Sequence, residues 1–76
     1  MLHNKYIWEG KYRAAILEPN PIKLAERIET AREQINRRLE YLRVNFGPMD
    51  GEELSAMQEA LSELRVLERI EVRRRA

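Results

Sequence analysis

Residues 20–48 read NPIKLAERIETAREQINRRLEYLRVNFGP and are the most informative stretch of the chain. Apolar residues recur in it every three or four positions, which is the spacing of one face of an α-helix. They are Leu24, Ile28, Ala31, Ile35, Leu39, Leu42 and Phe46. Asn20 is a good N-cap, and Pro21 suits the first helical position because no N–H donor is needed there. The pattern predicts a long helix over residues 21–45.

Gly47 and Pro48 are expected to end this helix, the glycine in a left-handed turn conformation and the proline unable to continue the helix. The apolar stripe is narrow, because Arg32 and Arg38 border it on its two sides. A stripe of this width is typical of a helix that contacts one main partner helix.

A second helix is predicted over residues 51–73. Asp50 and Glu53 have the spacing of a capping box, in which the two residues satisfy each other's backbone N–H groups at the helix start. The helix then carries a wider apolar face, and Val66 and Ile70 lie outside it. That face consists of Leu54, Met57, Ala60, Leu61, Leu64 and Leu67. Since about five residues join two helices of similar length, we expect an antiparallel hairpin.

The first nineteen residues allow two interpretations. Residues 5–13 can form a small β-hairpin around Glu9 and Gly10, although Glu-Gly is a weaker turn signal than Asn-Gly. Residues 7–17 can instead form a short helix, because the segment after Tyr12 favours helix. One side of that helix would then carry Trp8, Tyr12, Ala15 and Ile16. We favour the short helix, packed across the open side of the hairpin.

The chain is therefore expected to be a single all-α domain over residues 1–76. It would comprise an N-terminal aromatic segment (1–19) and two long helices whose segments, with their caps, are 20–46 and 50–74. A domain this small usually gains stability from disulfides, metal ions or association with another chain. Because the chain has no cysteine, we expect it to dimerise into a helical bundle.

Fifteen residues spread over about residues 8–68 resemble a set of short, uncharacterised bacterial helical-hairpin proteins with a tryptophan-bearing first segment. They are Trp8, Tyr12, Ala15, Glu18, Leu24, Arg27, Ile28, Ala31, Ile35, Ala60, Leu61, Leu64, Arg65, Val66 and Leu67. No activity is known for that set, so the resemblance implies no functional residue. It implies the short N-terminal helix and a bacterial cytoplasmic setting.

We expect no catalytic, cofactor-binding or metal-binding residue. His3 is the single histidine, and Thr30, Ser55 and Ser62 lie on predicted helices with no histidine near them in the sequence. Nucleophilic and acid–base catalysis need a nucleophile with a base, or paired carboxylates in a shielded cleft. The three glycines are scattered at turns and form no phosphate-binding loop. A non-enzymatic protein is expected; a dimeric helical enzyme with an inter-chain site is a more distant alternative.

Charge is distributed in blocks although the net charge is only +1. Residues 47–68 carry six acidic residues and one arginine. The C-terminal arginines are candidate contacts to nucleic-acid phosphates, since clustered cations bind a backbone without reading its sequence. They are Arg69, Arg73, Arg74 and Arg75. A small nucleic-acid-associated protein is thus an alternative, but the neighbouring acidic block and the pI of about 8.1 argue against it.

Two glutamates continue the apolar face of the second helix toward its C-terminal end. In the antiparallel hairpin Glu68 and Glu71 are expected to meet Lys23 and Arg27. We interpret these four side chains as a partly solvated ion-pair cluster that closes this end of the hairpin and contributes little stability.

The leading hypothesis is a self-associating protein–protein interaction module, most simply a homodimer. The face of the second helix, extended by Val66 and Ile70, would meet another chain. Trp8 and Tyr12 are expected to pack onto the hairpin; alternatively they are exposed contacts, because large aromatic side chains often anchor interfaces. The two interpretations coincide if the packing partner is a second copy of the chain. The apolar runs are far shorter than the roughly 20 residues of a membrane-spanning helix, and no signal-peptide pattern opens the chain. A cytoplasmic protein without membrane contact is expected.

Overall fold

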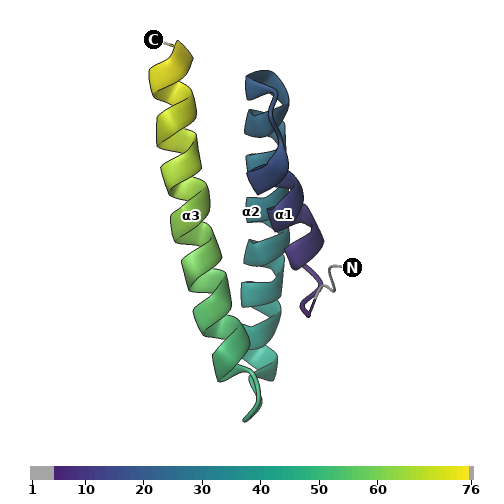
Figure 1. The fold of residues 1–76 in the computed structure, drawn as a ribbon. Helices are drawn as coiled ribbons and strands as arrows, with labels where there is room; N and C mark the ends of the chain where they lie inside the picture. The colour runs from purple at the N-terminus through teal and green to yellow at the C-terminus, as the bar shows by residue number, and fades with distance from the viewer. Residues whose placement is uncertain (1–4, 76) are drawn as a thin grey trace.

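A computed structural model describes residues 5–75 of the chain, with the side chains of residues 5–71. These residues form three helices and no strand: α1 (Glu9–Leu17), α2 (Pro21–Asn45) and α3 (Gly51–Arg75). Successive helices run in opposite directions, and α2 and α3 form the predicted antiparallel hairpin (Figure 1). The short helix α1 packs against both. The all-α hairpin is confirmed, and residues 9–17 are helical rather than part of a β-hairpin.

The start of α2 follows the prediction closely. The Asn20 side chain accepts hydrogen bonds from the backbone N–H groups of Ile22 (2.9 Å) and Lys23 (3.3 Å). Pro21 is the first helical residue and has no N–H to satisfy. A side-chain cap and a proline together define the corner between α1 and α2.

The end of α2 differs from the prediction in two respects. None of the glycines has a positive φ, so Gly47 does not adopt the left-handed conformation. Phe46 already has an extended backbone, which takes its side chain off the helical stripe and leaves it 55% exposed. The expectation that Phe46 completes the apolar face was wrong, because the helical spacing no longer applies beyond Asn45.

Asp50 closes the loop between the two long helices. Its carboxylate accepts the N–H of Gly47 at 2.8 Å, and a Cβ on that glycine would lie 3.3 Å from the same carboxylate oxygen. A larger residue at this position would therefore require the Asp50 carboxylate to shift by a few tenths of an ångström. The predicted capping box is not formed, because Asp50 bonds the loop and Glu53 turns toward the core.

The core lies where the three helices meet. From α2 it takes Ile28, Ala31, Ile35 and Leu42, from α3 Met57, Ala60 and Leu64, and from the N-terminal segment Trp8 and Ala15. The prediction that α2 has one main partner is corrected, since its stripe meets both α1 and α3. The molecule measures 44 × 28 × 15 Å along its principal axes. Such a flat arrangement leaves broad helix faces uncovered.

Candidate functional site

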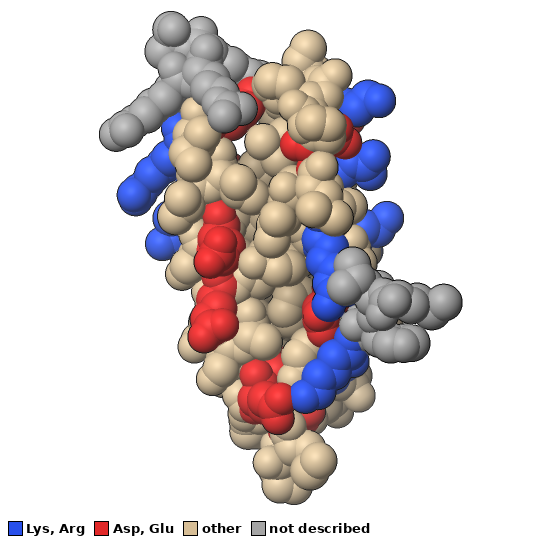
Figure 2. All heavy atoms as spheres, in the orientation of Figure 1, with Lys and Arg blue, Asp and Glu red and all other residues tan. Residues whose placement is uncertain are grey.

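An open groove of about 380 Å³ lies between the N-terminal segment and α3. One wall consists of α1 and the residues just before it, and the other of the first half of α3. Figure 2 shows a strip of uncharged side chains with acidic groups on its α3 side and, on its α1 side, basic groups with an acidic group between them. We call this feature the α1–α3 groove. Its wall residues are Lys5, Tyr6, Trp8, Glu9, Tyr12, Arg13, Glu52, Ala56, Glu59, Ala60 and Glu63.

Three aromatic rings form the α1 side of the groove. Tyr6 stacks on Trp8 with ring centroids 5.6 Å apart, and Tyr12 meets the Trp8 ring edge-on at 6.1 Å. Trp8 is only 2% exposed, whereas Tyr6 and Tyr12 are partly buried. The tryptophan is therefore a core residue, and the two tyrosines present the accessible aromatic surface.

Glu53 holds this aromatic cluster on the hairpin. Its carboxylate accepts the Trp8 Nε1–H at 3.1 Å and a bidentate pair from Arg38, at 2.9 Å from Nε and 3.0 Å from Nη2. The side chain is nearly fully buried, and the whole residue is 5% exposed. A single carboxylate on α3 thus ties α2 and the segment before α1 together. Bidentate, charge-assisted bonds of this kind fix geometry strongly.

The α3 wall combines small residues with free carboxylates. Ala56 and Ala60 bring the helix backbone close to the groove. Glu59 and Glu63 follow on the same side of α3, and neither takes part in an ion pair among the described residues. Helical spacing continues this side to Val66 and Ile70, which are 52% and 45% exposed. The groove therefore leads into an apolar surface toward the C-terminal end of α3.

The α1 wall carries the two cations Lys5 and Arg13 and the carboxylate of Glu9. Lys5 forms an exposed ion pair with Glu52 across the lower end of the groove, and this contact raises the pKa of Lys5 and lowers the pKa of Glu52. Arg13 pairs with Glu9 along the same side of α1, at 3.4 Å. The α1 wall thus has a net charge of +1 from Lys5, Arg13 and Glu9, whereas the α3 wall has three carboxylates, those of Glu52, Glu59 and Glu63.

Tyr12 reports on this environment. Burial raises the pKa of Tyr12 above its ordinary value of about 10, and the carboxylates of Glu63 and Glu59 raise the pKa further. Both effects disfavour the phenolate in the folded protein. An unfolded tyrosine therefore ionises at lower pH than the folded one, and the free energy of unfolding must fall as the pH rises above about 10.

We expect Tyr12→Phe to reduce this alkaline loss of stability, because the substitution removes the ionising group and keeps the ring. Urea unfolding at pH 9 and pH 11 measures the difference. The control is Tyr41→Phe at an exposed position.

In a Tyr6→Phe/Tyr41→Phe background, Glu59→Gln with Glu63→Gln should lower the pKa of Tyr12 in a tyrosinate absorbance titration. An unchanged titration would mean that the carboxylates do not face the phenol.

The structure separates the candidate interaction residues into two groups. Trp8 is buried within its own chain, which contradicts a role as an exposed contact. Tyr12 borders the groove, and Val66 and Ile70 are exposed further along α3, outside the lining of the groove. Arg69 is exposed on α3, whereas the side chains of Arg73, Arg74 and Arg75 lie outside the described residues. No signal in the sequence marked Glu59 and Glu63 as groove residues beyond their spacing of four.

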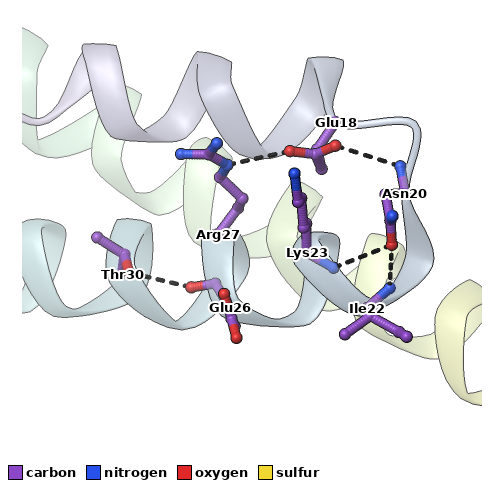
Figure 3. Close-up of polar contacts among 7 residues, drawn as sticks. All are labelled: Glu18, Asn20, Ile22, Lys23, Glu26, Arg27 and Thr30. Atoms are coloured by element: carbon purple, nitrogen blue, oxygen red, sulfur yellow. Dashed lines mark hydrogen bonds and ion pairs between the residues drawn. The ribbon is translucent and has the colours of Figure 1, made fainter.

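The expected ion-pair cluster at the C-terminal end of α3 is rearranged. Glu68 pairs with Arg32 at 2.7 Å. Arg27 pairs instead with Glu18 at 3.1 Å, as Figure 3 shows. The corner at Asn20 brings Glu18 over Arg27, and the Asn20 N–H with Arg27 lowers the pKa of the Glu18 carboxyl. Glu71 is buried at 4% exposure. The predicted pairing of Glu68 with Arg27 is therefore wrong. Arg32 of α2 is the partner of Glu68, and Glu18 in the α1–α2 corner is the partner of Arg27.

A smaller hollow of about 280 Å³ lies between α1 and α2. Lys11, Lys23 and Arg27 border it together with Thr30, whose hydroxyl donates to the backbone carbonyl of Glu26 at 3.0 Å. The Glu26 side chain also borders the hollow, and Glu18 holds the guanidinium of Arg27. Two carboxylates thus offset much of its positive charge.

Comparison of the chain with protein-family models, curated proteins and solved structures found no match. Within residues 5–75, no helix combines the length and apolar character needed to cross a bilayer. In the same part of the chain, no three His, Cys, Asp or Glu side chains group as metal ligands.

Proposed function

We propose that this protein is a non-enzymatic helical interaction module that self-associates as a homodimer through the α1–α3 groove. The observation that carries the proposal is the exposed apolar edge of α3. Val66 and Ile70 are about half exposed, and they continue the side of the helix that lines a concave surface. Concave apolar surfaces with polar borders are typical of sites that another molecule covers.

The shape of the molecule supports the same proposal. α1 has nine residues and the long helices have twenty-five each, so α1 covers only part of the hairpin. A chain of 76 residues without disulfides has little core to spare. A second copy that covers the rest of the α3 edge adds buried apolar area, and no further segment of the chain has to fold to achieve it. Stability then becomes linked to protein concentration.

The other exposed apolar residues also lie outside the lining of the groove. Ile7, Leu17 and Ile22 are exposed just before α1 and around the α1–α2 corner. Tyr41, Val44, Phe46 and Met49 are exposed around the end of α2 and the loop that follows. None of them borders the α1–α3 groove, and Tyr41 is covered on one face by the Arg38 guanidinium, 5.0 Å from the ring centroid. Val44 therefore offers a matched control position for substitutions at Val66.

We expect light scattering at micromolar concentration to give about twice the chain mass of 9.1 kDa. The melting temperature should rise with protein concentration, because association stabilises the folded state by mass action. Val66→Asp should shift the protein toward monomer, since it places a charge in the apolar edge. Val44→Asp, with the same chemical change on the far surface, should leave the dimer intact.

Two results would contradict the proposal. A monomer with a melting temperature independent of concentration would show that the three helices suffice on their own. Dissociation by Val44→Asp but not by Val66→Asp would place the interface at the loop end of the hairpin instead.

A further inference from the structure

We propose that the second copy binds the α1–α3 groove about a two-fold axis parallel to the helices, so that α3 of each chain faces α1 of the partner. In this arrangement Glu59 and Glu63 of one chain lie opposite Arg13 of the other, and the pairing occurs twice. The inference rests on the proposed self-association and adds the orientation of the partner and the residues that select it.

The charge on the two groove walls carries the argument. Glu59 and Glu63 line the α3 wall, and Arg13 lines the α1 wall together with its ion-pair partner Glu9. With Lys5, the α1 wall keeps one net positive charge against the carboxylates of the α3 wall. A two-fold axis parallel to the helices exchanges left and right without changing height. It therefore brings the acidic wall of one chain onto the basic wall of the other at the same level. Opposite charges then meet on both sides of the interface.

A two-fold axis perpendicular to the helices gives the opposite result. It places α3 against α3 of the partner, with the two copies running antiparallel. Centred on the groove, this arrangement brings carboxylates of one chain toward carboxylates of the other, and like charges across an interface disfavour a pairing. Glu59 and Glu63 have no cation of their own among the described residues to relieve the repulsion.

Packing favours the same orientation. Because the side chains of Ala56 and Ala60 are small, a helix can approach the α3 wall closely. One turn beyond Tyr12 on α1 lies Ile16, which is 43% exposed. With α3 facing the partner's α1, the edge formed by Val66 and Ile70 meets this isoleucine. The apolar ends of both walls are then covered together, above the charged middle of the groove.

Charge reversal tests the pairing. Glu63→Lys should raise the dimer dissociation constant roughly tenfold, because the unfavourable contact is created twice in a symmetric dimer. Arg13→Glu should have a similar effect. The double variant Arg13→Glu/Glu63→Lys exchanges the two charges and should return the dissociation constant to within about threefold of the original. Gln58→Lys, exposed on α3 and outside the groove, is the control.

Cysteine cross-linking gives an independent measurement that leaves Arg13 in place, which matters because Arg13 also pairs with Glu9. The chain contains no cysteine, so each introduced thiol is unique. Chains carrying Ile16→Cys and chains carrying Val66→Cys should form a mixed disulfide dimer when oxidised together. Val66→Cys alone should form little disulfide, because the two α3 helices lie diagonally across the interface.

The outcomes separate this inference from the proposed function. A monomer at all concentrations would overturn both. A dimer whose dissociation constant is unchanged by Arg13→Glu, and in which Val66→Cys alone cross-links efficiently, would leave self-association standing and overturn the orientation, in favour of an antiparallel α3–α3 pairing. Rescue by the double charge exchange together with the mixed disulfide would establish the parallel two-fold.

Discussion

Leu64→Asp is expected to abolish the cooperative helical fold at 25 °C. Leu64 is fully buried at the centre of α3, where the three helices meet. The substitution removes the burial of a large apolar side chain and places a carboxylate without a partner in the core. Together these changes cost about 4 kcal/mol or more, a large part of the stability of a small domain. Circular dichroism should show loss of helix or a broad, non-cooperative melt.

The matched control is Gln58→Asp on the exposed side of the same helix. It adds the same charge and a similar loss of helix propensity, which amounts to a few tenths of a kcal/mol. This variant should melt close to the original protein. If Leu64→Asp melted as the control does, the face of α3 that we describe as buried would have to be another one.

Glu53→Ala is the second substitution with a large expected effect. It leaves the Trp8 indole N–H and the Arg38 guanidinium without their buried acceptor. Breaking one side of a buried ion pair is more costly than replacing the whole pair by apolar groups. Arg38 keeps 30% of its side chain exposed and regains some hydration, so we expect a loss of about 2–3 kcal/mol. Urea unfolding gives the free energy, and the fluorescence of Trp8, the single tryptophan, reports whether the ring loses its burial.

Glu52→Ala is the natural control, because Glu52 is adjacent in sequence and pairs with Lys5 at the surface. Exposed ion pairs contribute little, so this variant should unfold at nearly the same urea concentration as the original protein. Equal losses for the two alanine variants would mean that the buried carboxylate does not hold α1 on the hairpin. An unchanged tryptophan spectrum in Glu53→Ala would show that packing alone positions Trp8.

The long helices could be predicted because their signals are local. The apolar residues of α2 recur at helical spacing over five steps, from Leu24 to Leu42, and Asn20 with Pro21 specifies the start without reference to any other part of the chain. The short loop then leaves the antiparallel hairpin as the natural arrangement. The same locality explains the helix over residues 9–17, where helix-favouring residues outweighed a weak turn at Gly10.

The fate of polar side chains could not be predicted in this way. Glu53 has the sequence position of a capping residue, yet it bonds Trp8 from the segment before α1 and Arg38 from α2 and lies in the core. Arg32 and Arg38 were recognised as the borders of the α2 stripe, and the structure adds that each reaches a glutamate of α3. Which carboxylate a given arginine meets depends on how two packed helices are aligned along their axes. The spacing of residues within one helix does not determine this alignment.

The sequence alone therefore specified the number, the approximate length and the pairing of the helices, since periodicity, caps and loop length act within a few residues of one another. The tertiary structure decided what those elements leave open. Trp8 is almost fully buried in the core, and Glu59 and Glu63 of α3 line the same groove as Arg13 of α1. These positions are about fifty residues apart in the sequence, and their arrangement is set by how α1 docks on the hairpin. Local patterns specify a helix face, whereas only docking determines which part of that face is covered and which part remains available to a partner.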